Sequence, residues 1–250
     1  MIDKIELSSK ASSIRKRLGE DEASPVDIFT LAQGIEGLTL VFYPLGKNIS
    51  GACFRSEHSS LIAIHSGMSI GRQRYTLAHE LYHYYFDEKR TSTICSSKIG
   101  SGNEEEKKAD LFASYFLMPP AALYEAVQRY KGSDNHSLSI REIIRLEQHF
   151  GMSHQATLIR LQEDGSLSAG QAASMQSGII ALASRLGFDV SLYKPSSNEK
   201  RMQVFGHYIC QAERLLETDK ISNGKYEELL LDAFREDIVF GEEAEGGGYD

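Results

Sequence analysis

The sequence predicts an α+β fold, in which a small antiparallel sheet packs with helices and is followed by an all-helical C-terminal extension. Three short runs of β-branched and aromatic residues follow one another between residues 38 and 65, with turn residues between them. Because no helical pattern separates these runs, antiparallel pairing is favoured. From residue 70 onwards, apolar residues recur mainly at helical spacing. A chain of 250 residues, 41% of them hydrophobic, can bury one good core and a smaller appendage.

The N-terminal part is expected to contain two helices and three strands. The helices are expected at residues 4–18 and 25–36, and the strands at residues 38–43, 51–55 and 60–65. The last strand directly precedes a helix that carries two closely spaced histidines. We therefore expect a free edge along residues 61–65 to lie beside a cleft, where it would pair with an extended substrate backbone.

The run His79-Glu80-Leu81-Tyr82-His83 lies in a helix-compatible segment and has the spacing of a zinc-peptidase motif. A helix turns by about 100° per residue, so His79 and His83 lie one turn apart on the same face and can bind one cation. Glu80 adjoins them, where a carboxylate can accept a proton from bound water. The same projection places Thr76 and Asp87 near this face.

A catalytic zinc site needs a third protein ligand and leaves a fourth position for water. Residues 103–120 are expected to form a second helix, on which Glu106 and Asp110 lie at positions i and i+4. We predict that Glu106 is the third ligand, and that Asp110 accepts the free N–H of a ligand histidine and orients it. Glu104 and Glu105 are the competing ligands, and by projection they lie off the face that carries Asp110.

Residues 91–102, between these two helices, are rich in Ser and Gly and are expected to form a loop that borders the cleft. Cys95 in this loop is a lone thiol and is expected to be a bystander rather than a ligand. The three cysteines of the chain are odd in number and widely spaced, which favours a reducing cytoplasm over a disulfide framework. No apolar run is long enough for a membrane span, and early charges at Asp3, Lys4 and Glu6 argue against a signal peptide.

The part of the chain after residue 118 is expected to be helical. Helices at 139–150 and 154–162, joined by a break at 151–153, have the shape of a helix-turn-helix unit, so a DNA-binding regulator is an alternative function. Between residues 135 and 170, however, three arginines stand against four acidic residues, whereas a module that neutralises phosphates is usually basic. We therefore expect no direct binding of nucleic acid. The remaining helices are expected at residues 121–131, 171–186, 202–217 and 225–240.

Several separated motifs resemble the ImmA/IrrE family of metallo-endopeptidases, which are gluzincin-like zinc peptidases. They occur in the same order as in the family and cover roughly residues 10–167. The motifs are Ser24-Pro-Val-Asp-Ile28, Ile49-Ser-Gly-Ala52, Arg72-Gln-Arg-Tyr-Thr-Leu-Ala-His-Glu-Leu-Tyr-His83, Glu106-x-x-Ala-Asp-x-Phe-Ala113, Leu117-Met-Pro119, Phe150-Gly-Met-Ser153 and Arg160-Leu161. Tyr82 departs from the pattern, because family members often have Gly there; it lies at the flank of the ligands and removes no donor.

The resemblance implies a zinc-dependent endopeptidase that holds one catalytic Zn²⁺ through His79, His83 and Glu106 and uses Glu80 as its general base. It also implies a protein substrate, a helix-turn-helix transcriptional repressor, whose cleavage relieves repression in stress or mobile-element regulation. Two other functional classes are weighed against this one. The first is a DNA-binding regulator with a vestigial metal site, and the second is a protein-binding regulator that keeps the fold without cleaving.

The predicted organisation has four parts. A zinc peptidase domain (1–134) is followed by a helix-turn-helix-like helical subdomain (135–170), a helical C-terminal region (171–240) and a flexible acidic tail (241–250). Partner specificity, regulation and dimerisation are all open as roles for residues 171–240. The expected location of the whole chain is the cytoplasm.

Overall fold

The computed structural model describes residues 2–87, 91–131 and 137–241. These residues form an α+β fold, which confirms the predicted class. The strands are β1 (Leu38–Tyr43), β2 (Ile49–Arg55), β3 (Ser60–His65), β4 (Ser92–Ser96) and β5 (Gln203–Gly206). The helices are α1 (Lys4–Arg17), α2 (Ile28–Gln33), α3 (Ile70–Phe86), α4 (Glu104–Leu117), α5 (Pro120–Lys131), α6 (Ile140–Phe150), α7 (His154–Glu163), α8 (Ala169–Ser174), α9 (Ile179–Arg185), α10 (His207–Glu217), α11 (Asn223–Asp232) and α12 (Glu236–Phe240), with short 3₁₀ helices η1 (Ser191–Tyr193) and η2 (Asn198–Lys200).

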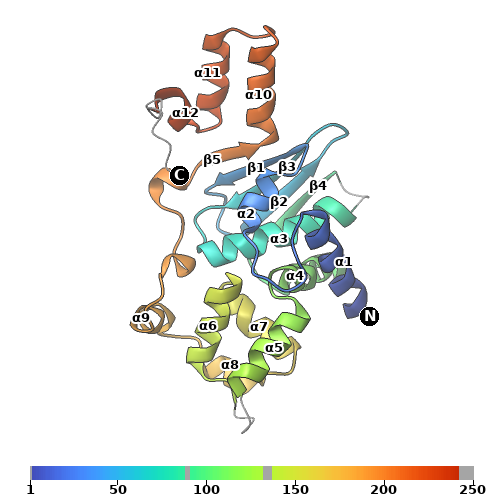
Figure 1. Ribbon diagram of the computed structural model, residues 1–250, viewed down its shortest axis with the longest axis vertical. Helices are drawn as coiled ribbons and strands as arrows, with labels where there is room; N and C mark the ends of the chain where they lie inside the picture. Colours follow the sequence, from blue (N-terminus) through green and yellow to red (C-terminus); the bar gives the residue numbers. More distant parts are fainter. Residues whose placement is uncertain (1, 88–90, 132–136, 242–250) are drawn as a thin grey trace.

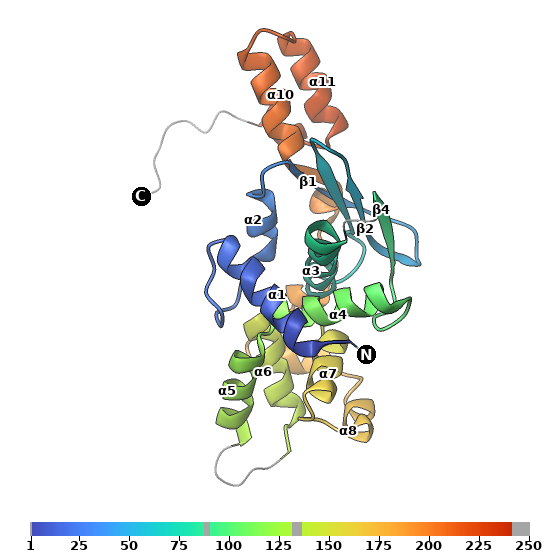
Figure 2. The ribbon, with the colours of Figure 1, turned by 90° about the vertical axis from the view of Figure 1, so that its right-hand side faces the viewer.

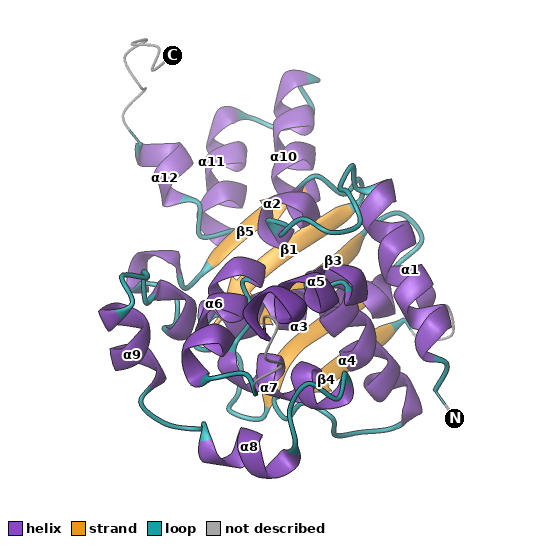
Figure 3. Cartoon of the chain, turned by 60° about the horizontal axis from the view of Figure 1, so that its bottom comes forward, coloured by secondary structure: helices purple, strands orange, loops and turns teal. Residues whose placement is uncertain are grey.

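The sheet lies at the centre of the molecule and separates two groups of helices (Figure 1). On one side α3 packs against the strands, and α4 and α1 follow it outwards, as the turned view in Figure 2 shows. Helices α5 to α8 form a bundle beyond α3, and Figure 3 shows this bundle from its own side with the strands behind. The hairpin of α10 and α11 rises from the opposite end of the sheet, next to β1 and β5.

The sheet is mixed rather than purely antiparallel, with the strand order β4-β2-β3-β1-β5. β2 pairs antiparallel with β3 and β4, and β5 pairs antiparallel with β1, but β1 and β3 run parallel. The prediction of an antiparallel sheet is therefore wrong for this one pair. It assumed that strands adjacent in sequence are adjacent in space. Instead β3 lies between β1 and β2, so two strands that run in the same direction become neighbours.

The central position of β3 removes the free edge that was expected along residues 61–65. β3 pairs with β1 from Ser60 to His65 and with β2 from Ser60 to Ile64. The hypothesis that this strand pairs with substrate is wrong, because its backbone groups are already used on both sides.

The edge strand near the ligand helices is β4, within the segment 91–102 that was expected to be a loop. Its residues alternate, with Thr93 and Cys95 buried and Ile94 exposed, as in a strand that has one face on the core. The run is only five residues long and lies among serines and glycines, so its local strand signal is weak.

The opposite edge is closed by β5, which lies in a segment expected to be helical from residue 202. Gln203–Gly206 pair with β1, and α10 begins only at His207. Gly206 has a φ of +77°, and a Cβ there would lie 2.6 Å from the Leu38 carbonyl oxygen. The bend from strand to helix therefore requires glycine.

The predicted helix-turn-helix shape is present as α6 and α7, joined through Gly151 with a φ of 66°. The predicted domain boundaries stay predictions. The boundary between residues 134 and 135 lies outside the described residues, as do residues 242–250 of the predicted tail. Within the described part of the chain, every helix is too short or too polar to cross a membrane.

Candidate metal centre

α3 carries the predicted ligands and is enclosed by the sheet on one side and by α4 on the other. Every residue from Tyr75 to His83 is buried. His79 and His83 lie one turn apart, as predicted, and their Nε2 atoms are 3.3 Å from each other. Two imidazole nitrogens this close can share one proton or bind one cation.

α4 brings Glu106 to the two histidines. The Asn103 side chain caps α4 by accepting a hydrogen bond from the Glu106 amide at 3.1 Å, which places Glu106 in the first turn. Glu106 Oε2 lies 3.3 Å from His79 Nε2, and its Oε1 lies 3.6 Å from His83 Nε2. Ligand atoms about 2.0–2.1 Å from a tetrahedral zinc are separated from one another by roughly 3.3–3.4 Å. The three donors therefore fit a zinc ion in both chemistry and spacing.

The competing ligands Glu104 and Glu105 are used elsewhere. Glu105 accepts a hydrogen bond from the Tyr82 hydroxyl at 3.1 Å and pairs with Lys108 at 2.7 Å. Glu104 lies 3.6 Å from the same lysine. The Tyr82 ring packs against Phe112, with 5.7 Å between ring centroids. The Tyr82 side chain, which replaces the glycine common in the family, thus fills the space between α3 and α4 and leaves the donors in place.

The second nitrogen of each predicted ligand histidine faces a carboxylate. His79 Nδ1 lies 2.9 Å from Asp110 Oδ1, as predicted, and Asp110 Oδ2 accepts a hydrogen bond from the Gly100 amide at 2.6 Å. His83 Nδ1 lies 3.4 Å from Asp87 Oδ2, and Asp87 is at the face predicted for it. A carboxylate at Nδ1 favours the tautomer whose Nε2 carries no proton and is free to bind metal.

Burial and these carboxylates together set the charges of the two histidines. Burial lowers the pKa of His79, but hydrogen bonds with Asp110 and Glu106 outweigh it and raise the pKa to about 9. Burial and the nearby charge of His79 lower the pKa of His83. In the metal-free protein one imidazole therefore holds the proton while the other stays neutral. Metal binding requires that this proton be released.

Glu80 is fully buried beside the histidines, at the position predicted for the general base. Neither of its carboxylate oxygens has a well-aligned hydrogen-bond donor among the described residues. Gly51 of β2 packs directly on it, since a Cβ there would lie 2.8 Å from Glu80 Oε1 and 2.7 Å from Thr76 Cγ2. Burial raises the pKa of Glu80 to about 7. Such a carboxyl can take up and return a proton near neutral pH.

Cys95, which was expected to be a bystander, lies with His79, His83 and Glu106 in one group of donors. His79, His83, Cys95 and Glu106 each present one donor atom, and these atoms all lie within 4.8 Å of one another. Cys95 is opposite Gly51 in the pairing of β2 with β4, so the register of these strands brings it close to the other three donors. Burial and the negative charges of Glu80 and Glu106 raise the pKa of the thiol above its usual range. No local sequence pattern indicates this position, because it depends on a strand pairing distant in sequence.

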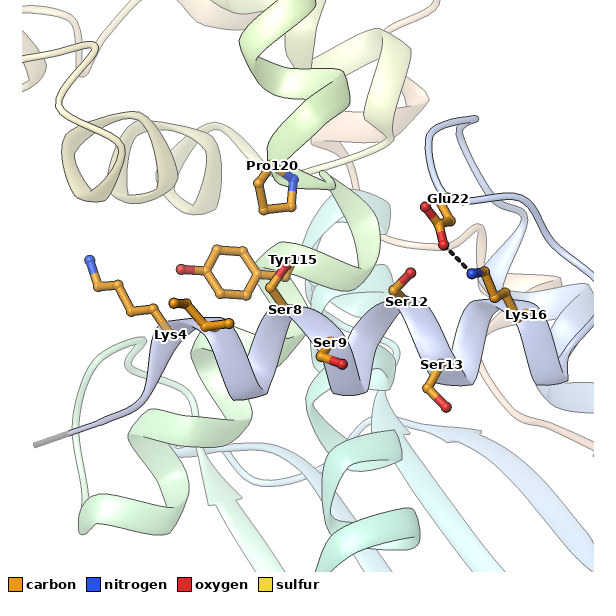
Figure 4. A pocket seen from close by; sticks show the side chains of 10 residues that line it. Lys4, Ser8, Ser9, Ser12, Ser13, Lys16, Glu22, Tyr115 and Pro120 are labelled. Atoms are coloured by element: carbon orange, nitrogen blue, oxygen red, sulfur yellow. Dashed lines mark ion pairs between the residues drawn. The ribbon is translucent and has the colours of Figure 1, made fainter.

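A groove of about 590 Å³ opens beside the centre. Its walls come from β4 and the start of α4, namely Ser92, Thr93, Ile94, Ser96, Ser101, Gly102, Asn103 and Glu106. A larger groove of about 760 Å³ lies away from the centre, where the serines of α1 face Tyr115 and Pro120 (Figure 4). None of the four donor residues lines that larger groove. The groove along β4 reaches the metal centre through Glu106.

Comparison with known proteins places strands β1 to β4, the helices α3 and α4 and the helix pair α6–α7 in one family domain. The model of the IrrE N-terminal-like domain, peptidase family M78, matches residues 35–162. The radiation response metalloprotease IrrE of Deinococcus radiodurans is 35% identical over 108 residues, which are 42% of this chain and 32% of that protein. The protein of the same name from Deinococcus deserti is 32% identical over 108 residues, or 42% of this chain and 37% of that protein. The chain thus spans about a third of the length of these relatives. Because the family domain covers about half of the chain and contains every donor described above, the chain belongs to the IrrE N-terminal-like family of peptidase family M78.

Proposed function

We propose that the chain is a zinc-dependent endopeptidase. The observation that carries this proposal is the buried Glu80 carboxylate beside three converging donors, which are separated by 3.3–3.6 Å. These side chains supply the ligands and the base that a metal-dependent peptidase needs. The name metalloprotease, borne by two relatives from Deinococcus, supports the same class of reaction.

The residues of the centre have separate roles in this reaction. A zinc ion held by His79, His83 and Glu106 would make a water molecule more acidic and polarise the scissile carbonyl. Glu80 accepts the proton of that water and later passes it to the leaving amine. Asp110 keeps the His79 ring turned toward the other donors through the 2.9 Å contact at Nδ1.

We further propose that the substrate binds as an extended strand along β4. Within the described residues β4 pairs with β2 on one side, and the groove beside Glu106 runs along its residues. An edge strand offers backbone donors and acceptors, which give affinity with little dependence on substrate sequence. β4 can pair with a substrate backbone in the way expected for residues 61–65, because β4 rather than β3 is the edge strand beside the metal centre.

The substrate we propose is a helix-turn-helix transcriptional repressor, cut to relieve repression in a stress response or on a mobile element. The resemblance to the ImmA/IrrE family supports the repressor, and the words "radiation response" in the names of two relatives support the regulatory setting. Such a substrate places the chain in the cytoplasm. The free state of Cys53, Cys95 and Cys210 agrees with a reducing compartment.

The test uses the zinc-loaded full chain and a small helix-turn-helix repressor, sought first among the products of the neighbouring genes. Glu80→Gln is expected to keep zinc and to bind the repressor, but to lose about 10²–10⁴-fold in cleavage rate, because its side chain cannot accept the proton. Glu105→Gln is the matched control, since Glu105 lies next to the ligand Glu106 in sequence but pairs with Lys108. Mass spectrometry of the fragments reads out cleavage. A Glu80→Gln protein that cuts at the wild-type rate would overturn the proposal.

A role as a DNA-binding regulator has less support. Arg160, one of the three arginines near the helix-turn-helix pair, is 2% exposed, and its guanidinium lies 4.7 Å from the Tyr115 ring centroid. It is therefore used inside the protein rather than offered to phosphates. A gel-shift assay is expected to show no steep dependence of binding on salt concentration, which true phosphate contacts would produce.

A further inference from the structure

The Cys95 sulfur lies among the three donors that are proposed to hold zinc. It belongs to a group of four donor atoms that all lie within 4.8 Å of one another. Zinc–sulfur bonds are about 2.3 Å long and zinc–nitrogen bonds about 2.0–2.1 Å, so ligand atoms on one tetrahedral zinc lie roughly 3.3–3.7 Å apart. The four donors are therefore already gathered to within about 1 Å of ligand spacing.

The surroundings of Cys95 suit a metal-bound sulfur better than an inert core thiol. The residue is 1% exposed and forms no disulfide. The Glu80 and Glu106 carboxylates have the largest charge effects on it. An apolar neighbourhood is usual for a structural cysteine, whereas two carboxylates facing a sulfur are a setting in which a cation stabilises all three.

We propose that Cys95 is a fourth protein ligand and that its thiolate closes the metal centre. The sulfur lies within 4.8 Å of the donor atoms of His79, His83 and Glu106, so a thiolate bound to the same zinc would take the fourth tetrahedral position. A water molecule must occupy this same place if Glu80 is to take its proton. The thiolate and the water therefore exclude each other. The state with four protein ligands is latent, and cleavage requires the sulfur to leave. This inference rests on the proposed zinc peptidase function.

Opening requires a shift of β4, which can move more easily than the helices that carry the other ligands. α3 is packed on both sides, but β4 has five residues and pairs with β2 alone among the described residues. The pairing also has a register irregularity between Ile49 and Gly51, directly opposite Cys95. In the opening step the metal–sulfur bond breaks and water takes the place of the sulfur, so it is a ligand exchange that needs no oxidant or reductant.

The edge along which we propose the substrate to pair belongs to the same strand. Substrate binding to β4 and release of Cys95 therefore involve one movable element. This connection gives a physical reason for a peptidase that stays inactive until its protein substrate docks.

The first test is zinc X-ray absorption spectroscopy on the zinc-loaded full chain. The wild-type protein is expected to show one sulfur at about 2.3 Å beside nitrogen and oxygen ligands at about 2.0–2.1 Å. Cys95→Ala is expected to lose the sulfur signal, and Cys53→Ala to keep it. Cys53 is the matched control because it is equally buried, on the neighbouring strand, but outside the donor group. The wild-type spectrum alone already tests for a sulfur ligand. Cys95→Ser replaces Cys95→Ala if the alanine variant does not fold.

The second test asks whether the thiolate closes the centre, using the cobalt-substituted protein and acetohydroxamate, a small metal-binding probe. The visible spectrum of the cobalt changes when the probe reaches an open position. Half-saturation of the wild type is expected to need at least about tenfold more acetohydroxamate than Cys95→Ala, because a site that is open a tenth of the time binds about ten times more weakly. Cys53→Ala is expected to respond as the wild type does.

The outcomes separate this inference from the proposed function. Zinc bound to the wild type without a sulfur ligand overturns the inference and leaves the peptidase proposal intact. Equal half-saturation in the wild type and Cys95→Ala overturns the closing role even if sulfur is bound. A wild-type chain that binds no zinc overturns both proposals, and loss of cleavage in Glu80→Gln tests the peptidase proposal independently.

Discussion

Histidine meets carboxylate both in the metal centre and in the helical bundle, and the two groups differ in where the imidazole nitrogens point. In the metal centre, Nε2 of His79 and Nε2 of His83 face each other at 3.3 Å. In the helical bundle, His154 Nδ1 lies 2.5 Å from Glu147 Oε1, and His154 Nε2 lies 2.7 Å from the Met175 carbonyl oxygen. Both nitrogens of His154 thus face acceptors, which favours a protonated ring in a partly buried ion pair.

The comparison shows that burial beside a carboxylate does not make a histidine a ligand. One ring nitrogen must also be left facing other donors. The second oxygen of Glu147 accepts a hydrogen bond from the Tyr193 hydroxyl at 2.8 Å, so this group is fully used in joining α6, α7 and η1. In the metal centre the two Nε2 atoms face each other and the Glu106 carboxylate, so three donors converge on one place. One group therefore holds the bundle together, and the other is available for chemistry.

The largest expected effect is on stability, from removing the carboxylate of the bundle group. Glu147→Ala is expected to lower the free energy of unfolding by about 3–5 kcal/mol, because it leaves the His154 side chain, which is only 13% exposed, without its counterion. Urea denaturation measures this loss. Zinc content per folded molecule is expected to stay at the wild-type value, and a variant that also loses zinc would show that the two groups are coupled.

The next effect concerns the ligands. His83→Ala is expected to weaken zinc binding by more than about 100-fold, since even the loss of a residue that only orients a ligand costs about 10–100-fold. Zinc affinity is measured by competition with a chromophoric chelator. His149→Ala is the control, because His149 is exposed on α6. Equal losses in the two variants would remove His83 from the ligand set.

Asp110 is expected to have a smaller effect, because it acts through His79. Asp110→Asn is expected to weaken zinc binding by about 10–100-fold while the fold is kept. The same chelator competition reads it out. Glu105→Gln, on the same helix, is expected to leave the affinity unchanged, and an unchanged affinity in Asp110→Asn would mean that the His79 tautomer is fixed by something else.

The smallest expected effect is a dependence of stability on pH, which arises from the ion pair of His154 and Glu147 in the helical bundle. Burial lowers the pKa of His154, but its contact with Glu147 outweighs burial and raises the pKa above the ordinary value of about 6.5. The stability from this ion pair is therefore fully present below about pH 6.5 and is lost as the pH rises through the raised pKa. The difference in urea midpoint between wild type and His154→Gln is expected to shrink with rising pH. A difference that grows with pH would contradict the assigned charge state.

Sequence periodicity could predict the part of the centre that depends on single helices. The spacing of His79, Glu80 and His83 follows from one helical turn, and the spacing of Glu106 and Asp110 follows in the same way. Local spacing could not predict that α3 and α4 bring these residues together. The family resemblance indicated this contact. The class of fold was predictable for the same reason, because helix and strand periods differ.

The features that sequence could not predict depend on strand pairing. Cys95 reaches the donors through the register of β4 with β2, and β3 loses its expected edge because it lies between β1 and β2. His154 shows the same dependence among helices, because the turn at Gly151 between α6 and α7 separates it from Glu147 in sequence. Pairing between distant segments leaves little trace in local patterns.

β5 has a consequence for solubility. It covers β1 from Thr39 to Phe42 and comes from a segment more than 150 residues away in the chain, beyond the matched family domain. A chain shortened to residues 35–162 would expose the backbone of β1, whose Leu40 and Phe42 side chains are apolar. Exposed apolar edge strands are templates for aggregation. The region after residue 170 therefore protects this edge of β1 from pairing with other copies of the chain.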